Sequence, residues 1–360
     1  MRAPTLAELA SRGHENNFDL VRLVAALAVI VSHSFSLAVS QGEPLARLTG
    51  GALSIGEIAV DIFFLTSGFL VTGSLFSRRD LFAFIASRLL RIYPGLIVMV
   101  ILTVTLAGLF APAGFFVHPD TIHYITATAF LWFPKLTYFH LPGFFELNPW
   151  PVAVNGSLHT LPFELRMYGV LAALWLAASL HKRSRLTLMA AGIVGLAVAG
   201  AAMRVALPDG QMSRFVFMFF TGGTFFVLRA RIRLHGGLAV ACAVAVVVSV
   251  CNRHMFFVAY NLLLGYALFS LSYLPKLWRP TSDVSYGTYI YAFPIQQCIA
   301  MLIPGVTWYA MSGFAIPSVL LLAWLSWHFV EKPAMRLKKH FGWLPSPDLR
   351  TRQPEPVSSR

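Results

Sequence analysis

Two ionisable residues, Arg22 and His33, lie inside the first long apolar stretch of the chain, where a membrane helix normally carries neither. Eleven positions separate them, so in a helix they share one face and lie roughly 16 Å apart along the axis. A guanidinium binds anions, and an imidazole takes up and releases protons near neutral pH. Because ionisable groups are costly inside a bilayer, we interpret this pair as a candidate site.

Two carboxylates, Asp61 and Glu164, enter later apolar stretches from the outer side. Both are expected to lie at a depth comparable with that of His33. A carboxylate beside an imidazole fixes its tautomer and raises its basicity, which suits a general base. We therefore predict His33, Asp61 and Glu164 as catalytic residues. The alternative is that the carboxylates serve structural needs, for example by pairing Glu164 with Arg166.

Arg88 and Arg91 form a second basic group just before the third apolar stretch. Their i, i+3 spacing places them on one helical face, and Pro94 falls in the first turn of the predicted span, where its missing N–H costs little. Alone, they fit the ordinary excess of positive charge at a cytoplasmic face. Beside Arg22, at nearly the same depth, they form a candidate anion clamp, because guanidinium forks suit the phosphates of a nucleotide.

The elements that must position these residues are membrane helices. Of the 360 residues, 57% are hydrophobic and only 12% are charged, which is too apolar for a soluble domain of this length. Repeated apolar runs predict an all-α polytopic membrane protein. The ten predicted spans are about 18–39, 56–76, 92–112, 158–180, 186–206, 213–230, 236–252, 255–273, 284–304 and 310–330.

The basic residues indicate how this bundle is oriented. Roughly 22 of the 28 Lys and Arg residues fall on the side that holds both termini, which is the positive-inside pattern of a cytoplasmic face. The formal net charge of +13 therefore reports topology and contact with anionic membrane lipids, and no nucleic-acid partner is expected. The three cysteines show no metal-ligand or disulfide spacing, so no metal is predicted.

Three segments lie outside the spans. Residues 1–17 are polar and are expected to form a cytoplasmic N-terminal segment, followed by a membrane domain over 18–336. Residues 337–360 are expected to be a disordered cytoplasmic tail. The long outer loop, 113–155, contains an apolar run over 122–133 that is too short to span and predicts an interfacial or re-entrant helix. This loop either packs as a plain lid on the bundle or covers an outward-facing acceptor site.

An ordered set of motifs resembles the membrane-bound acyltransferase-3 family over roughly residues 16–336. The set comprises Arg22-x10-His33, the block Ala59–Phe69, Arg88-x-x-Arg91, Ser157-Leu-His-Thr-Leu with Glu164 and Tyr168, Ser285-Tyr286-Gly-Thr-Tyr289 with Pro294, and Phe329-Val-Glu331-Lys-Pro333. Members of this family acylate bacterial surface and extracellular carbohydrates, and have about ten spans with cytoplasmic termini.

The resemblance implies an acyl-CoA donor, most often acetyl-CoA, whose nucleotide would bind on the cytoplasmic side near Arg22, Arg88 and Arg91. The thioester would then reach towards His33, which would either deprotonate the acceptor hydroxyl or carry the acyl group itself. Asp61 would orient His33, and Glu164 would position the sugar. The expected setting is the bacterial inner membrane, with a free or lipid-linked carbohydrate acceptor and a polysaccharide-synthesis complex as a candidate partner.

A different class of protein competes with this interpretation. Buried ionisable groups in a helical bundle also suit a proton-coupled transporter or flippase for a lipid-linked saccharide or a small solute. Such a carrier needs a central site that opens to each face in turn, whereas the acyltransferase needs arginines that bind CoA without any gradient. A scaffold protein, the third alternative, would not need His33.

Overall fold

The computed structural model describes residues 3–11, 13, 16–38, 42–77, 80–111, 113–131, 140–151, 153–181, 183–276, 278 and 282–338. Over these ranges the chain is helical, and its only β-type pairing is an isolated bridge between Thr5 and Arg233. The predicted all-α class is therefore confirmed. The predicted disordered tail lies almost entirely outside the described residues.

Each of the ten predicted spans is occupied by a helix. Their bounds are α2 Phe18–Leu37, α4 Ile55–Ser77, α5 Leu81–Phe110, α7 Leu161–Ser179, α8 Arg185–Ala206, α9 Gln211–Val227, α10 Gly236–Ser249, α11 Arg253–Ser272, α12 Ser285–Leu302 and α13 Trp308–Ser326. By length and composition, seven described helices can cross a membrane. Of the other three, α9 and α10 are shorter, with 17 and 14 residues, and α12 is more polar over its 18 residues.

Shorter elements join the long helices. They are α1 Leu6–Ala10, α3 Pro44–Leu48, α6 Pro119–Phe130, α14 Lys332–Arg336, the 3₁₀ turns Phe115–Val117 and Gly156–Thr160, and the π-helical turn Trp327–Glu331. The α6 helix corresponds to the predicted short apolar run of the outer loop, and begins three residues earlier than expected.

The third span differs from the prediction. The helix α5 begins at Leu81, eleven residues before the predicted start, with Asp80 capping the backbone N–H of Phe82 at 2.9 Å. Arg88 and Arg91 consequently lie within this helix, and Pro94 is in its interior, not in its first turn. Hydropathy missed this part of the helix because its two arginines make it too polar for a membrane segment, although they do not prevent helix formation.

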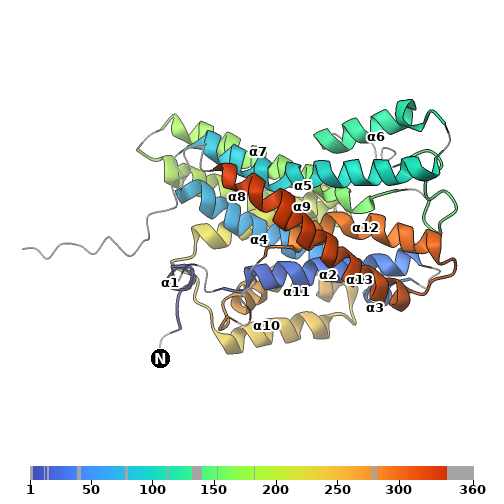
Figure 1. The fold of residues 1–360 in the computed structure, drawn as a ribbon. Helices are drawn as coiled ribbons and strands as arrows, with labels where there is room; N and C mark the ends of the chain where they lie inside the picture. The colour runs from blue at the N-terminus through green and yellow to red at the C-terminus, as the bar shows by residue number, and fades with distance from the viewer. Residues whose placement is uncertain are drawn as a thin grey trace, which may run out of the picture.

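Successive long helices alternate in direction, and Figure 1 shows α1 and the end of α13 at one end of the bundle. We refer to that end as the terminal end. The opposite end, which holds α3 and α6, is the loop end (Figure 1). Residues 18, 77, 81 and 285 therefore belong to the terminal end, and residues 37, 55, 110 and 302 to the loop end.

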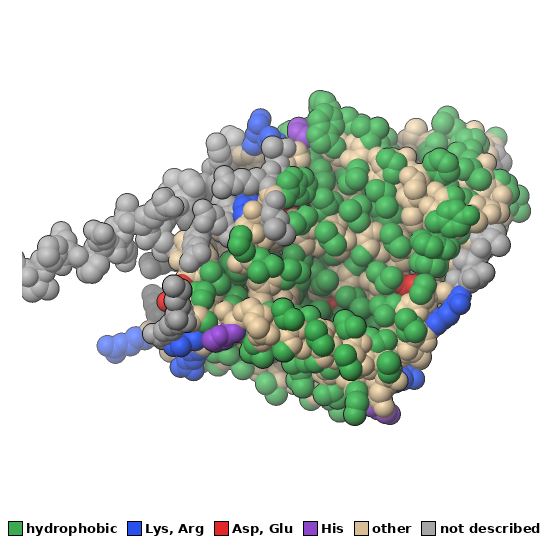
Figure 2. Space-filling model, turned by 90° about the horizontal axis from the view of Figure 1, so that it is seen from below, with side chains coloured by type: hydrophobic (Ala, Val, Ile, Leu, Met, Phe, Trp, Pro, Cys, Tyr) green, Lys and Arg blue, Asp and Glu red, His purple; other side chains and the backbone are tan. Residues whose placement is uncertain are grey.

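The outer surface of the bundle suits a lipid environment. Hydrophobic side chains cover the face formed by the helices in Figure 2, and the Lys and Arg side chains lie at its edges. Leu262, in the middle of α11, is 70% exposed, and Val248, near the end of α10, is 68% exposed. Such exposure is unfavourable in water but normal against hydrocarbon, so the structure agrees with a multi-pass membrane protein.

Close packing between α4 and α9 forms the centre of the fold. Gly68 of α4 faces the backbone of Phe219, and Gly222 of α9 faces the backbone of Leu65. A Cβ at either glycine would collide with the opposite backbone, so the two helices approach each other only because both residues are glycine. This contact fixes the position of α4, which carries Asp61 and Ser67.

Candidate functional site

Two of the predicted arginines meet at an acidic residue, Asp283, just before α12. Arg91 of α5 contacts the Asp283 Oδ2 atom at 2.6 Å, and Arg22 of α2 lies 3.9 Å from the same oxygen. Burial alone would raise the pKa of Asp283, but the two guanidinium groups outweigh it and hold the pKa at about 2. The structure thus brings Arg22 and Arg91 together, as their predicted depths required.

Arg91 is held by a second carboxylate. Its Nη1 atom lies 3.6 Å from Oε2 of Glu331, which is buried in the π-helical turn at the end of α13. The Ser326 hydroxyl donates to the other oxygen of Glu331 at 2.9 Å. Because Arg91 is shared between two carboxylates, it orders the terminal end of the site and has little capacity left for an additional anion.

Arg88, one turn earlier on α5, is different. Its Nε–H donates to the hydroxyl of its neighbour Ser87 at 3.3 Å, and no carboxylate of the described residues lies within ion-pair distance of its guanidinium. Arg22, Arg91 and Glu164 lie within electrostatic range of it. Arg88 is therefore the guanidinium of this cluster whose remaining N–H groups are available to an incoming anion.

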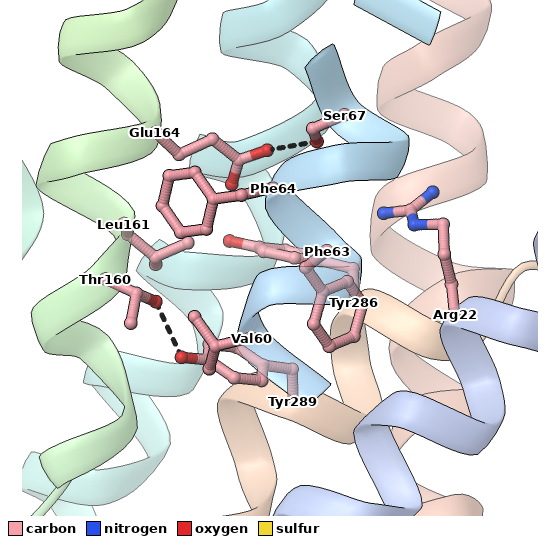
Figure 3. Close-up of a pocket in the computed structure, with 10 residues that line it drawn as sticks. All are labelled: Arg22, Val60, Phe63, Phe64, Ser67, Thr160, Leu161, Glu164, Tyr286 and Tyr289. Carbon is pink, nitrogen blue, oxygen red and sulfur yellow. Dashed lines mark hydrogen bonds between the residues drawn. The ribbon is translucent and has the colours of Figure 1, made fainter. Parts of the chain in front are cut away.

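A cavity begins beside Arg22 and extends between α2, α4, α7 and α12 (Figure 3). The empty space in it is about 460 Å³ when open solvent at its mouth is included. Its walls combine aromatic rings with a few polar groups, and it is lined by Arg22, Val60, Phe63, Phe64, Ser67, Thr160, Leu161, Glu164, Tyr286 and Tyr289.

Glu164 is the carboxylate of this cavity. The Ser67 hydroxyl donates to its Oε1 at 2.8 Å, as Figure 3 shows, and the Tyr168 hydroxyl donates to the same oxygen. The described hydrogen bonds and ion pairs of Glu164 thus do not include Arg166, the structural partner considered in the sequence analysis. Ser67 lies six residues beyond Asp61 on α4, roughly 9 Å closer to the terminal end. The expectation that Glu164, Asp61 and His33 lie at comparable depth is therefore wrong for Glu164.

The loop end of the cavity leads towards His33. Thr160 and Tyr289 close the cavity there with a hydrogen bond of 2.6 Å. His33 is not among the lining residues, but its ring lies 5.2 Å from that of Phe293, one turn after Tyr289 on α12. Its Nδ1 atom is buried and has no hydrogen-bond partner among the described residues. An imidazole nitrogen that the described residues leave without a hydrogen bond is suited to a substrate.

Asp61 belongs to a separate network. It is fully buried, lies 3.1 Å from Nε of Arg214 on α9, and accepts a hydrogen bond from the Tyr260 hydroxyl at 2.8 Å. Arg214 also pairs with Glu57, one turn from Asp61 on α4. The described hydrogen bonds and ion pairs of Asp61 do not include His33. No direct contact among the described residues therefore supports the predicted role of Asp61 in orienting His33.

Three residues of these networks were missed in the sequence. Arg214 stands beside the apolar run Phe215–Phe220 in a predicted span, which is the same signal that identified Arg22. Asp283 immediately precedes a predicted span. It was missed because the residues before it are polar, which is typical of an exposed loop. Tyr260 carries no signal that separates it from other tyrosines of an apolar helix.

The fold and the site together define a class: a helical membrane protein with an internal cavity, a guanidinium cluster at one end of it and a half-buried histidine beyond the other. The chain belongs to the acyltransferase-3 family, whose profile, described as an acyltransferase domain, matches residues 15–328. This confirms the resemblance found in the motifs, and the protein is an acyltransferase that transfers groups other than aminoacyl groups.

Two curated proteins are similar over nearly their whole length. The O-acetyl transferase of Shigella phage Sf6 is 29% identical over 336 residues, which cover 89% of this chain and 96% of that protein. Nodulation protein 10 of Rhizobium leguminosarum bv. viciae is 30% identical over 362 aligned residues, which cover 91% of this chain and 95% of that protein. No solved structure matches the chain.

Proposed function

We propose that this protein is an inner-membrane O-acetyltransferase that moves an acetyl group from cytoplasmic acetyl-CoA to a hydroxyl of a bacterial envelope glycan or exopolysaccharide. The observation that carries the proposal is the cavity that starts at Arg22 and is closed at its loop end by Thr160 and Tyr289. Tyr289 is one helical turn from Phe293, whose ring packs against His33. The similarity to a phage O-acetyl transferase supports both the acetyl group and transfer to oxygen.

The donor would bind at the terminal end. Arg88 has unpaired N–H groups for the phosphates of CoA, and Arg22 stands at the mouth of the cavity. Arg91, fixed by Asp283 and Glu331, holds both helices in place around them. The pantetheine arm is narrow and uncharged, so it suits the mainly aromatic walls, with their few polar groups, between Arg22 and Thr160. The basic excess at the terminal end supports its cytoplasmic location.

The chemistry would take place at the loop end. His33 accepts the proton of the acceptor hydroxyl, the oxygen attacks the thioester carbonyl, and the carbon–sulfur bond breaks. The departing CoA thiolate then takes up the proton from His33, which regenerates the neutral imidazole. In the alternative, His33 is acetylated first and passes the acetyl group to the hydroxyl in a second step. Both routes need an unblocked ring nitrogen, as the lone Nδ1 of His33 provides.

The acceptor would enter from the loop end. Here Asn148 in the outer loop donates to the Gln297 side chain at 2.8 Å, and Asn155 donates to the Ile290 carbonyl at 2.9 Å. These contacts hold Asn148 and Asn155 against α12, the helix that carries Phe293. The outer loop is thus attached to the helix whose Phe293 packs against His33, as the role of an acceptor cover requires.

Gene deletion tests this proposal most directly. Surface and secreted glycans of the deletion strain would be compared by mass spectrometry after complementation with wild type, His33→Ala or Arg88→Ala. We expect loss of an acetyl-sized mass that wild type restores and His33→Ala does not. An unchanged glycan together with altered solute uptake would contradict the proposal and favour a proton-coupled carrier.

A further inference from the structure

A second imidazole, His159, lies close to His33 at the loop end. Phe293 connects the two: its ring is 5.2 Å from the His33 ring, and it also packs so closely on Gly156 that a Cβ there would lie 2.8 Å from the phenyl carbons. His159 is attached to that same glycine, because its Nδ1 atom lies 2.8 Å from the Gly156 carbonyl oxygen. Consistently, the two imidazoles lie within electrostatic range of each other.

The contact with Gly156 determines what the His159 ring can do. A carbonyl oxygen only accepts hydrogen bonds, so Nδ1 must carry the proton. In the neutral ring, Nε2 is then left with a lone pair and acts as an acceptor. The contact with Gly156 is the one hydrogen bond that the described residues make with this ring, so its Nε2 acceptor is not used by the protein.

The position of His159 relates it to the cavity. The next residue, Thr160, lines the loop end of the cavity, and its hydroxyl is fixed by Tyr289. The Tyr289 hydroxyl donates in turn to the Ser157 carbonyl at 2.7 Å, so the 3₁₀ turn Gly156–Thr160 is pinned to α12 on both sides of His159. A ring on such a rigid turn has a defined direction, as a specificity residue requires.

We propose that His159 is an acceptor-binding residue, whose Nε2 accepts a hydrogen bond from a second hydroxyl of the sugar while the reacting hydroxyl faces His33. The acceptor would accordingly be a sugar with two neighbouring free hydroxyls, of which His159 selects the one to be acetylated. This inference rests on the proposed function. The reacting hydroxyl has a single proton, which it donates to His33, so it cannot also donate to His159. The two imidazoles must therefore bind two different hydroxyls.

Steady-state kinetics of three variants test this assignment. The acceptor is the unacetylated glycan purified from the deletion strain, the donor is acetyl-CoA, and the enzyme is the full chain in detergent. His159→Phe keeps a flat ring but removes the acceptor atom, whereas His159→Gln places an amide oxygen near the position of Nε2. His254→Phe, an exposed residue at the same end, is the control for the substitution itself.

We expect His159→Phe to raise the KM for the glycan by about 3- to 10-fold, the range for one lost hydrogen bond, and to leave the KM for acetyl-CoA unchanged. His159→Gln should recover part of this loss. The acetyl position, read by NMR of the product, should become mixed in His159→Phe and stay single in the wild type and in His254→Phe. A structural defect would lower kcat for every substrate without creating a mixture of positions.

Two outcomes would overturn the inference in distinguishable ways. If wild type transfers acetyl groups but His159→Phe keeps both the glycan KM and the single acetyl position, the assignment of His159 is wrong and the proposed function stands. If wild type acetylates no glycan at all, the proposed function is wrong and the inference fails with it.

Discussion

Arg91 and Asp283 form an ion pair of 2.6 Å that joins the middle of α5 to the start of α12, across 192 residues of sequence. The same Asp283 oxygen lies 3.9 Å from Arg22, so one carboxylate holds arginines of two helices. This arrangement leaves Arg88 as the guanidinium of the cluster with no carboxylate partner among the described residues. In the proposed function, Arg91 would hold the site together and Arg88, one turn away on the same helix, would bind the donor.

The Asp283 pair predicts a pH dependence of stability. The folded pKa of about 2 lies below the ordinary value of 3.8, so the carboxylate stabilises the folded state above pH 4. This contribution is lost as the pH falls from about 4 to about 2, and it amounts to roughly 2 kcal/mol. Thermal unfolding in detergent over this pH range should show the loss. In Asp283→Asn the slope should be smaller, and an unchanged slope would show that the pair does not stabilise the fold.

Arg88→Gln is expected to raise the KM for acetyl-CoA by about 10- to 100-fold, because charge-assisted hydrogen bonds to phosphate are lost. The change in kcat should be small, since Arg88 lies near the terminal end of the bundle and His33 near its loop end. Steady-state kinetics with varied acetyl-CoA would measure both. Arg185→Gln, at the same end but stacked on Trp175, is the matched control and should leave the KM unchanged. Equal effects of the two substitutions would indicate a general charge effect.

His33→Ala is expected to lower kcat by about 10²- to 10⁴-fold, the usual contribution of a general acid–base residue. Binding of acetyl-CoA, measured by calorimetry, should be retained because the arginine cluster is unchanged. Intact-mass spectrometry of the wild type, incubated with donor and no acceptor, separates the two routes. An acetyl adduct that is absent from His33→Ala indicates an acyl carrier, and its absence from a rapidly quenched wild type indicates a general base. Full activity of His33→Ala would refute both.

Gly68→Ala is expected to destabilise the protein by about 1–3 kcal/mol or more, since the added methyl group collides with the backbone of α9. Gly195→Ala on α8 is the matched control, because nothing lies within 4 Å of a Cβ at that position. It should be neutral or stabilising by about 0.5–1 kcal/mol, as expected for alanine in a helix. Thermal unfolding of the two variants in one detergent provides the comparison. Similar melting temperatures would mean that α4 and α9 are not in close contact.

The sequence determined the helices and their order by itself. Membrane spans are set by local hydropathy and length, so all ten predicted spans coincide with helices. The prediction that Arg22 and His33 share one helical face was also based on local sequence, because it follows from helical periodicity alone. The one large boundary error, at α5, arose where a helix continues beyond the apolar stretch and carries arginines that hydropathy excludes.

Only the tertiary structure decided which charges meet. Asp61 pairs with Arg214 and not with His33, and Glu164 is bound by Ser67 and Tyr168, closer to the terminal end than predicted. Such partners are distant in sequence, and their contacts depend on how helices rotate and approach, which glycines such as Gly68 control through backbone packing. A single sequence states that a buried charge needs a partner. The packing of the helices determines which partner it receives.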